Sequence, residues 1–441
     1  MDLRSLTSSN KLLYILVASI SLLVFLTIVL ILRGLGGTSS QRMNIEVWGV
    51  FDTIDAYSTV FRKFENSHPN IHVAYREFSY EDYEAQLVNA LASGTGPDVA
   101  LMHHTWLPKH GDKLVPMPEG KLPGYDAPLM TIRDFRLQFV DVAFTDLVQD
   151  NRIYAMPLYV DTLALFYNRD LLNSSSLTAP PKTWNAFNDA VTALTKLDAI
   201  GNIIQSGAAI GTARNINRST DILMAFMLQS GVQMVNKDQG TATFTRSVDN
   251  QNVGEVALQY YTDFANPDKR TYCWNASQHY SVDAFTEGRT AMMFNYSHQI
   301  EIIKEKAARL NFAVAPMPQL SEPAITYANY WAPAVTNNAE NPNAAWELIA
   351  FLASREGALD YLTATRRPAA RRDIIEMQLD DPDLGAFAQQ ALTARSWYQV
   401  DNVAIEGIFA DMIEKVIFNE RTIRDALLEA ESAVDVLMGR R

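Results

Sequence analysis

The chain has 441 residues, of which 48% are hydrophobic and 20% are charged, and its formal net charge is -13. These values are ordinary for a globular protein, and the length is enough for two domains or one large bilobal unit. The negative charge argues against nucleic acid as a partner, because phosphate binding needs a concentrated basic surface. Cys273 is the only cysteine, so an intrachain disulfide and the usual cysteine-based zinc sites are excluded.

Residues 12–32 form an uncharged apolar run that predicts a membrane-spanning helix. At about 1.5 Å per residue, such a helix would cross the roughly 30 Å hydrocarbon core of a bilayer. The run is longer than the apolar part of a secretory signal and no convincing cleavage site follows it, which favours an uncleaved anchor over a cleaved signal peptide. We therefore expect a cytoplasmic tail at 1–11, a transmembrane anchor at 12–32 and a flexible linker at 33–42.

Basic residues on both sides of this run give its predicted orientation. Arg4 and Lys11 precede the run together with the α-amino group, whereas Arg33 and Arg42 follow it. The positive-inside rule leans toward an N-terminus inside the cell. The expected location is the cell membrane, with a single span and a globular body on the extracellular or periplasmic side.

The first part of the globular body alternates strand and helix patterns. Strands are predicted at 43–49, at 70–78 and, as a short apolar run, at 98–102. Apolar residues recur at helical spacing in 55–67 and 83–91. This β-α-β-α-β order predicts a mostly parallel sheet flanked by helices, which is an α/β fold.

Later segments continue the α/β pattern. Residues 153–166 contain two strand-like runs broken by Pro157, and helices are predicted to follow Thr183, Asn341 and Thr422. Because about 400 residues of this kind exceed one ordinary domain, two lobes are expected.

Catalytic signatures are absent from the sequence. We find no G-x-S-x-G elbow, no H-E-x-x-H, no P-loop and no G-x-G-x-x-G in the context of a dinucleotide site. His103, His104 and His110 lack a matching carboxylate framework for a metal. We therefore expect no enzymatic activity, no catalytic residues, no metal and no cofactor.

Five segments in order resemble the extracellular solute-binding proteins of family 1, the maltose-binding-like group. The most specific match is the stretch that would cross between two lobes. The segments are 93–99 (SGTGPDV), 153–172 (IYAMPLYVDTLALFYNRDLL) with PPKTW at 180–184, 285–292 (FTEGRTAM), PMP at 316–318 with Trp331 and NPNAAW at 341–346, and RPA at 367–369. The order and spacing match over about residues 43–440.

The resemblance implies a two-lobed, type II periplasmic-binding-protein-like fold that closes around its ligand by a hinge motion. The first lobe is expected to comprise 43–158 and 325–366. The second lobe is expected to comprise 159–316 and 367–441. Ligand would lie in the cleft between them.

By the same resemblance, the expected function is the substrate-binding component of an ABC-type importer, with ABC permease subunits as partners and a mono- or oligosaccharide as ligand. Sugars have apolar faces and hydroxyl rims, so aromatic rings together with charged or amide groups suit them. A membrane-anchored sensor or a binding module for another small polar solute, such as a polyamine or a glycerol phosphodiester, remains an alternative. A glycan-active enzyme would need two carboxylates across a sugar bond, and no motif supports that reading.

Candidate ligand residues of the first lobe follow the predicted strands, because binding groups gather at the carboxyl ends of parallel strands. The resemblance places a ligand-contacting acid at Asp52 and often a tryptophan at Trp331; Asp52 could instead cap the following helix. Related proteins carry an acid near Thr105 that this chain lacks. The first-lobe candidates are Trp48, Phe51, Asp52, His103, Trp106, Tyr330 and Trp331.

The remaining candidates lie at the crossing between the lobes and in the second lobe. The resemblance places a ligand acid at Asp161, which could instead be a hydrogen-bonding carboxylate at the hinge, and an aromatic side chain at Tyr296. Arg367 could supply a bidentate donor. These candidates are Tyr159, Asp161, Asn295, Tyr296 and Arg367.

Overall fold

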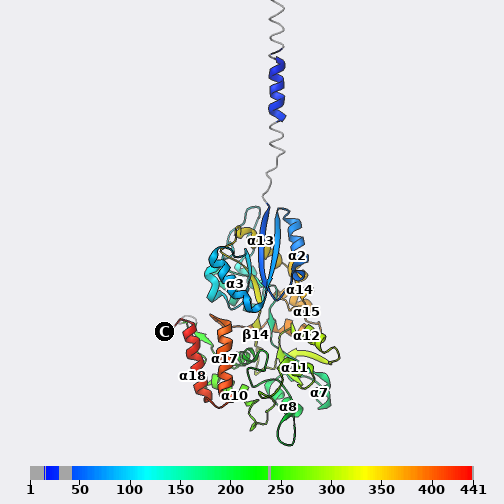
Figure 1. The fold of residues 1–441 in the computed structure, drawn as a ribbon, viewed down its shortest axis with the longest axis vertical. Helices are drawn as coiled ribbons and strands as arrows, with labels where there is room; N and C mark the ends of the chain where they lie inside the picture. The colour runs from blue at the N-terminus through cyan, green and yellow to red at the C-terminus, as the bar shows by residue number, and fades with distance from the viewer. Residues whose placement is uncertain (1–13, 15, 29–41, 237–239, 440–441) are drawn as a thin grey trace, which may run out of the picture.

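The computed structural model describes residue 14 and residues 16–28, 42–236 and 240–439 (Figure 1). Residues 16–28 are helical. No helix within the described part of the chain is both long and apolar enough to span a bilayer. Residues 12–13, 15 and 29–32 of the predicted anchor lie outside the described residues, as do the whole predicted tail and all of the predicted linker except residue 42.

The first lobe is built on a four-stranded sheet with the order β15-β3-β1-β2. β1 (Met43–Val50) pairs in parallel with β2 (Ile71–Phe78) and β3 (Val99–His103), whereas β15 (Trp331–Val335) is antiparallel to β3. Between these strands run α2 (Ile54–Ser67) and α3 (Tyr80–Ser93), so the predicted β-α-β-α-β order is confirmed.

Returning segments and a long loop region complete the first lobe. Apart from one short turn at 111–113, which buries no side chain, they contribute side chains to the same hydrophobic core as β1 and β3. The elements are α4 (Leu107–His110), the short 3-10 turn Gly111–Lys113, α5 (Ile132–Gln138), α6 (Asp141–Leu147), β4 (Val148–Gln149), β5 (Arg152–Ile153), α13 (Pro342–Leu352), α14 (Arg355–Thr365) and α15 (Arg372–Gln378).

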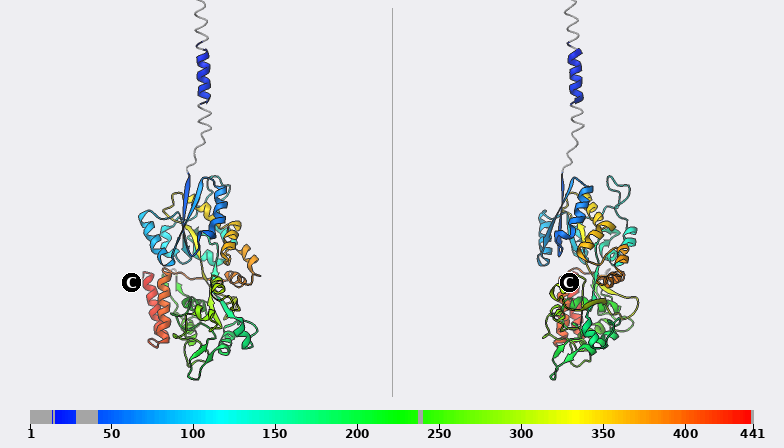
Figure 2. Two further views of the ribbon diagram at one scale, coloured as in Figure 1. Left: turned by 45° about the vertical axis from the view of Figure 1, so that its right-hand side comes forward. Right: turned by 90° about the vertical axis from the view of Figure 1, so that its right-hand side faces the viewer.

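The second lobe has a separate hydrophobic core around a three-stranded antiparallel sheet. β7 (Ala164–Asn168) is the central strand between β12 (Met292–Asn295) and β13 (Phe312–Pro316). Helices surround the sheet, and α17 and α18 pack side by side along one flank (Figure 2). The helices are α7 (Arg169–Ser174), α8 (Trp184–Leu194), α9 (Ser219–Gln229), α10 (Val253–Asp263), α11 (Ser281–Thr286), α12 (Gln299–Lys306), α16 (Gly385–Ala391), α17 (Asn402–Ile417) and α18 (Ile423–Leu437).

Two short ribbons lie at the periphery of the second lobe. They are β8 (Lys196–Leu197) with β9 (Ile203–Gln205), and β10 (Val235–Asn236) with β11 (Thr241–Ala242). The predicted helix starts are confirmed, because α8, α13 and α18 begin directly after Thr183, Asn341 and Thr422. Each of these side chains accepts a hydrogen bond from the first turn of its helix.

A small three-stranded sheet joins the lobes. β14 (Thr326–Asn329) pairs with β6 (Asp161–Thr162) and with β16 (Ala394–Arg395). On the side of the first lobe, the core runs up to Val160 and resumes at Ala328, and it includes Ala369 to Ile375. The expected division assigned 367–441 to the second lobe. Within that range, the core of the first lobe includes Ala369, Ala370, Ile374, Ile375, Ala388, Ala391 and Ala394.

Candidate functional site

A cavity of about 720 Å³ lies between the lobes. Phe51, His103 and Trp331 reach it from the first lobe, and Asp221 and Tyr296 reach it from the second. The full lining is Phe51, Tyr80, Glu81, His103, Tyr159, Asp161, Asn217, Arg218, Asp221, Met224, Tyr280, Tyr296, His298, Ile302, Tyr327, Asn329, Trp331, Arg367, Gln399, Asn402 and Glu406. Aromatic and charged groups therefore converge from segments far apart in the sequence.

The first lobe contributes an aromatic surface to this cavity. The ring centroid of Phe51 lies 5.4 Å from that of Tyr80 and 5.9 Å from that of Trp331. Phe51 is 53% exposed although it is large and apolar, and its φ of 70° lies in the left-handed region that a phenylalanine rarely adopts. An exposed apolar ring held in a strained backbone at a cavity is typical of a binding surface.

The second lobe faces this surface with a polar group formed around Tyr296. The Tyr296 hydroxyl donates a 2.8 Å hydrogen bond to Asp221 Oδ2, and the Arg218 guanidinium carbon lies 5.4 Å from the Tyr296 ring centroid. Burial raises the pKa of Asp221, and the nearby Arg218 charge opposes that rise. Glu406 of α17 adds another carboxylate whose pKa is raised, first by burial and then by Asp221.

Asp161 lies where the chain crosses between the lobes and is held by the second lobe. Its carboxylate accepts hydrogen bonds from the Ser297 hydroxyl at 2.7 Å, the Ser297 amide at 3.0 Å and the Thr162 amide at 2.9 Å. Burial raises the pKa of Asp161 to about 6, although these hydrogen bonds oppose the rise. The side chain lines the cavity, but its hydrogen bonds are those of a carboxylate that fixes the hinge.

Asp52 and Arg367 form a buried ion pair in the first lobe. Arg367 donates to Asp52 Oδ1 at 2.7 Å, and the Tyr361 hydroxyl donates to Asp52 Oδ2 at 2.7 Å. The Arg367 guanidinium carbon also lies 4.4 Å from the ring centroid of Tyr159. Arg367 and Tyr159 line this cavity, whereas Asp52 lines only an adjoining one that also includes Arg367. Asp52 therefore orients the arginine, and it does not cap α2, because the N-cap residue of that helix is Thr53.

The histidines of the cavity are uncharged at neutral pH. Burial lowers the pKa of His298 to about 3 and that of His103 well below its usual range. The His103 ring is held by Thr105 at 2.8 Å. These rings therefore offer hydrogen-bonding edges without charge.

Four further sequence candidates point away from the cavity. Trp331 and Tyr296 line the cavity, whereas their sequence neighbours Tyr330 and Asn295 do not. Tyr330 donates to Asp146 at 2.9 Å and Asn295 donates to Asn217 at 3.1 Å.

The other two of these four are tryptophans. Trp48 packs on Phe78 in the core of the first lobe, with its indole donating to Glu46 at 2.6 Å. Trp106 donates to Asn402 of the second lobe at 2.8 Å and packs against Trp331 from behind.

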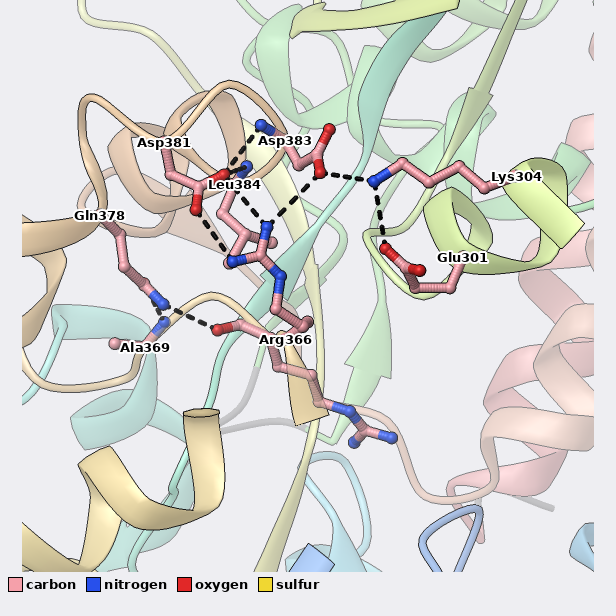
Figure 3. A network of polar contacts seen from close by, with 9 residues as sticks. Glu301, Lys304, Arg366, Ala369, Gln378, Asp381, Asp383 and Leu384 are labelled. Atoms are coloured by element: carbon pink, nitrogen blue, oxygen red, sulfur yellow. Dashed lines mark hydrogen bonds and ion pairs between the residues drawn. The ribbon is translucent and has the colours of Figure 1, made fainter. Parts of the chain in front are cut away.

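A second cavity of about 330 Å³ shares Phe51, His298 and Arg367 with the first. A charged network lies beside it (Figure 3). Lys304 of α12 pairs with Asp383 at 2.7 Å, and Arg366 pairs with Asp381 at 3.1 Å and with Asp383 at 3.4 Å. In Figure 3 the carboxylate of Asp383 lies between the two cations, so it links α12 of the second lobe to the end of α14 in the first.

Sequence reasoning missed several lining residues. Tyr80 and Glu81 directly follow the second strand, so the strand-end argument that selected Phe51 could have found them. Arg218 and Asp221 have no such signal, because they begin α9 after an irregular segment. The other residues missed are Asn217, Met224, Tyr280, His298, Ile302, Tyr327, Asn329, Gln399, Asn402 and Glu406.

Comparison with known proteins shows which family and which relatives the chain resembles. The family model described as bacterial extracellular solute-binding protein matches residues 59–386. A putative binding protein of Brucella abortus is 21% identical over 394 residues, which are 85% of this chain and 89% of the relative.

Two solved structures share the fold. One is a cyclo/maltodextrin-binding protein complexed with maltotetraose, with a TM-score of 0.73, 17% identity and coverage of 91% of this chain and 98% of that chain. The other is the sugar-binding protein MalE of Xanthomonas citri, with a TM-score of 0.72, 19% identity and coverage of 90% and 98%.

Proposed function

Because the chain belongs to the family of bacterial extracellular solute-binding proteins, we propose that it captures an extracellular mono- or oligosaccharide between its lobes and delivers it to an ABC-type importer. The observation that carries this proposal is that the cavity combines aromatic rings with charged groups: Phe51, Tyr80 and Trp331 form a ring surface on the first lobe, and Arg218, Asp221 and Tyr296 form a polar group on the second. A pyranose ring has one apolar face and a rim of hydroxyls, so it meets both surfaces at once.

Relatives support the choice of a carbohydrate. One structure with the same fold holds maltotetraose, and another is of a protein described as sugar-binding. The ligand-contacting set that we propose combines the sequence candidates at the cavity with the residues that the fold adds. It is Phe51, Tyr80, His103, Tyr159, Asp161, Arg218, Asp221, Tyr296, Trp331 and Arg367.

The proposed mechanism is binding followed by hinge closure, with no chemical change of the ligand. The family consists of binding proteins, and the two aspartates at the cavity accept hydrogen bonds from neighbouring side chains. Asp161 is engaged by Ser297, and Asp221 is engaged by Tyr296. Closure would move the second lobe about the strands β6, β14 and β16 and place the aromatic surface over the sugar.

The proposal includes a single-span anchor at residues 12–32 and a body outside the cell that docks on permease subunits. The uncharged apolar run supports the anchor. Resistance of the full-length protein to alkaline extraction from membranes, and loss of that resistance when 1–41 are removed, would test it. Release of the full-length protein by alkali would contradict it.

Calorimetric titration of the full-length protein in detergent tests the ligand class. Maltotetraose, mannotriose and glucose represent carbohydrates, and spermidine and glycerophosphocholine represent the competing solutes. We expect micromolar or tighter binding of at least one saccharide and no change in the saccharide recovered afterwards. Binding of only spermidine or glycerophosphocholine would replace the carbohydrate proposal, and recovery of a cleaved saccharide would contradict a binding role.

A further inference from the structure

The Arg218 side chain has an unused hydrogen-bonding face at the cavity. Its Nε is buried and has no partner, and the guanidinium group makes no hydrogen bond or ion pair within the described part of the chain. The backbone of Arg218 has a φ of 64°, in the left-handed region where arginine is uncommon. A buried donor without a partner is costly, so an arginine kept in such a conformation is expected to serve a ligand.

Asp221 offers an acceptor beside this donor. It lies in the first turn of α9, three residues after Arg218, where the helix dipole favours a carboxylate. Asp221 Oδ2 accepts from Tyr296, and Oδ1 has no hydrogen-bond partner among the described residues. Both side chains converge on Tyr296, because the guanidinium carbon lies 5.4 Å from its ring centroid. The Arg218 guanidinium and Asp221 Oδ1 are thus a donor and an acceptor, close together in the cavity wall, that can both bind a ligand.

We propose that Arg218 and Asp221 bind one pair of neighbouring ligand hydroxyls and that together they select an uncharged sugar unit at this position. This inference rests on the carbohydrate function proposed above. A hydroxyl both donates and accepts, so one of the pair accepts from the Arg218 guanidinium while the other donates to Asp221 Oδ1. An ammonium group only donates and is repelled by Arg218, whereas a carboxylate only accepts and is repelled by Asp221.

Other charges at the cavity do not change this local selection. Arg367 is paired with Asp52 at 2.7 Å, and Asp161 is held by Ser297. Glu81 and Glu406 add negative charge that acts on every ligand. Burial raises the pKa of Glu406, Asp221 raises it further and Arg218 lowers it, so the two variants shift that pKa in opposite directions. The preference of Arg218 and Asp221 for an uncharged sugar is therefore measured as the change, from the wild type to a variant, in competition by a charged sugar.

The first test uses the saccharide that binds the full-length protein most tightly among maltotetraose, mannotriose and glucose. Arg218→Gln and Asp221→Asn should each weaken its binding about 10- to 100-fold, because each loses one charge-assisted contact. The double variant should lose less than the product of the two factors, since both groups hold the same hydroxyl pair. Arg270→Gln, which changes an exposed arginine that pairs with Asp189 and lines neither cavity, should bind as the wild type does.

The second test uses glucosamine and glucuronate as competitors of that saccharide. Arg218→Gln should improve competition by glucosamine relative to the wild type, and Asp221→Asn should improve competition by glucuronate. Arg218→Gln keeps a side chain that must adopt the same left-handed backbone conformation, so the melting temperature of this variant should stay close to that of the wild type.

The inference is overturned if the affinity of either single variant for the saccharide is within twofold of the wild-type affinity. It is also overturned if the loss of affinity in the double variant equals the product of the two single losses, or if neither glucosamine nor glucuronate competes better with a variant than with the wild type. Failure of every saccharide to bind the wild type would instead overturn the carbohydrate function and this inference with it.

Discussion

The indole Nε1 of Trp106 in the first lobe donates a 2.8 Å hydrogen bond to Oδ1 of Asn402 in the second. Beside it, Lys109 pairs with Asp401 at 2.7 Å and with Glu84 of its own lobe at 2.7 Å. Because Asp401 is also the N-cap of α17, the end of that helix is fixed to the first lobe at one edge of the cavity. Trp106 therefore contributes to the contact between the lobes, although the sequence suggested it as a ligand residue.

Loss of these contacts should favour an open arrangement of the lobes. We expect Lys109→Met combined with Asn402→Ala to increase the radius of gyration of the ligand-free protein in X-ray scattering. The contacts are partly exposed, so together they stabilise closure by about 1–2 kcal/mol.

Lys63→Met is the matched control for this change, because Lys63 pairs with Glu356 and Asp360 within the first lobe. Its radius of gyration should stay at the wild-type value. Equal scattering of the double variant and the wild type would show that the Trp106 contact does not hold the lobes together.

The buried pair of Asp52 and Arg367 should matter far more for stability than the neighbouring exposed pairs. Arg367→Met leaves the Asp52 carboxylate without its cation, so the free energy of unfolding should fall by about 3–5 kcal/mol. Arg366→Met removes exposed ion pairs with Asp381 and Asp383 and should cost about 0–1 kcal/mol. Urea unfolding of the two variants measures the difference, and equal losses would contradict the proposed role of Asp52.

Asp161 should make stability depend on pH in a defined direction. Its pKa in the folded protein is about 6, above the ordinary value of 3.8, so between about pH 4 and pH 6 the folded state binds more protons than the unfolded state. Stability from this group is therefore present at low pH and is lost as the pH rises through that window, by up to about 3 kcal/mol.

Asp161→Asn removes this titration. The free energy of unfolding of the wild type minus that of the variant should fall between pH 4 and pH 6 and then level off. Asp112→Asn serves as a control, because Lys113 lowers the pKa of Asp112 at an exposed site, and its difference should be small and of opposite sign. If the difference in unfolding free energy between the wild type and Asp161→Asn is constant or rises with pH, the raised pKa of Asp161 is contradicted.

Phe51 should contribute to binding and little to stability. Phe51→Ala removes an exposed ring that lines the cavity, so affinity for the bound saccharide should fall about 10-fold while the melting temperature stays nearly constant. Phe61→Ala, at a position only 4% exposed in the core, should instead lower the free energy of unfolding by about 3–5 kcal/mol. Calorimetric titration and thermal unfolding separate the two effects, and a wild-type affinity for Phe51→Ala would remove Phe51 from the site.

Local patterns in the sequence determined the order of strands and helices, the helix caps and the ordered segments shared with the family. These features depend on residues a few positions apart, as in the cap that Thr422 provides to α18. The strand-end argument also placed Phe51 and His103 at the cavity, because the carboxyl ends of parallel strands meet at one edge of a sheet.

Only the tertiary structure decided which candidates line the cavity. Asp52 and Arg367 are 315 positions apart, and Trp106 and Asn402 are 296 positions apart, so no local pattern could show that they are partners. Arg218 and Asp221 reach the cavity because the core of the second lobe positions the start of α9 beside Tyr296, which follows β12. Side-chain direction at such sites follows from contacts between distant segments, whereas secondary structure follows mainly from neighbours in the chain.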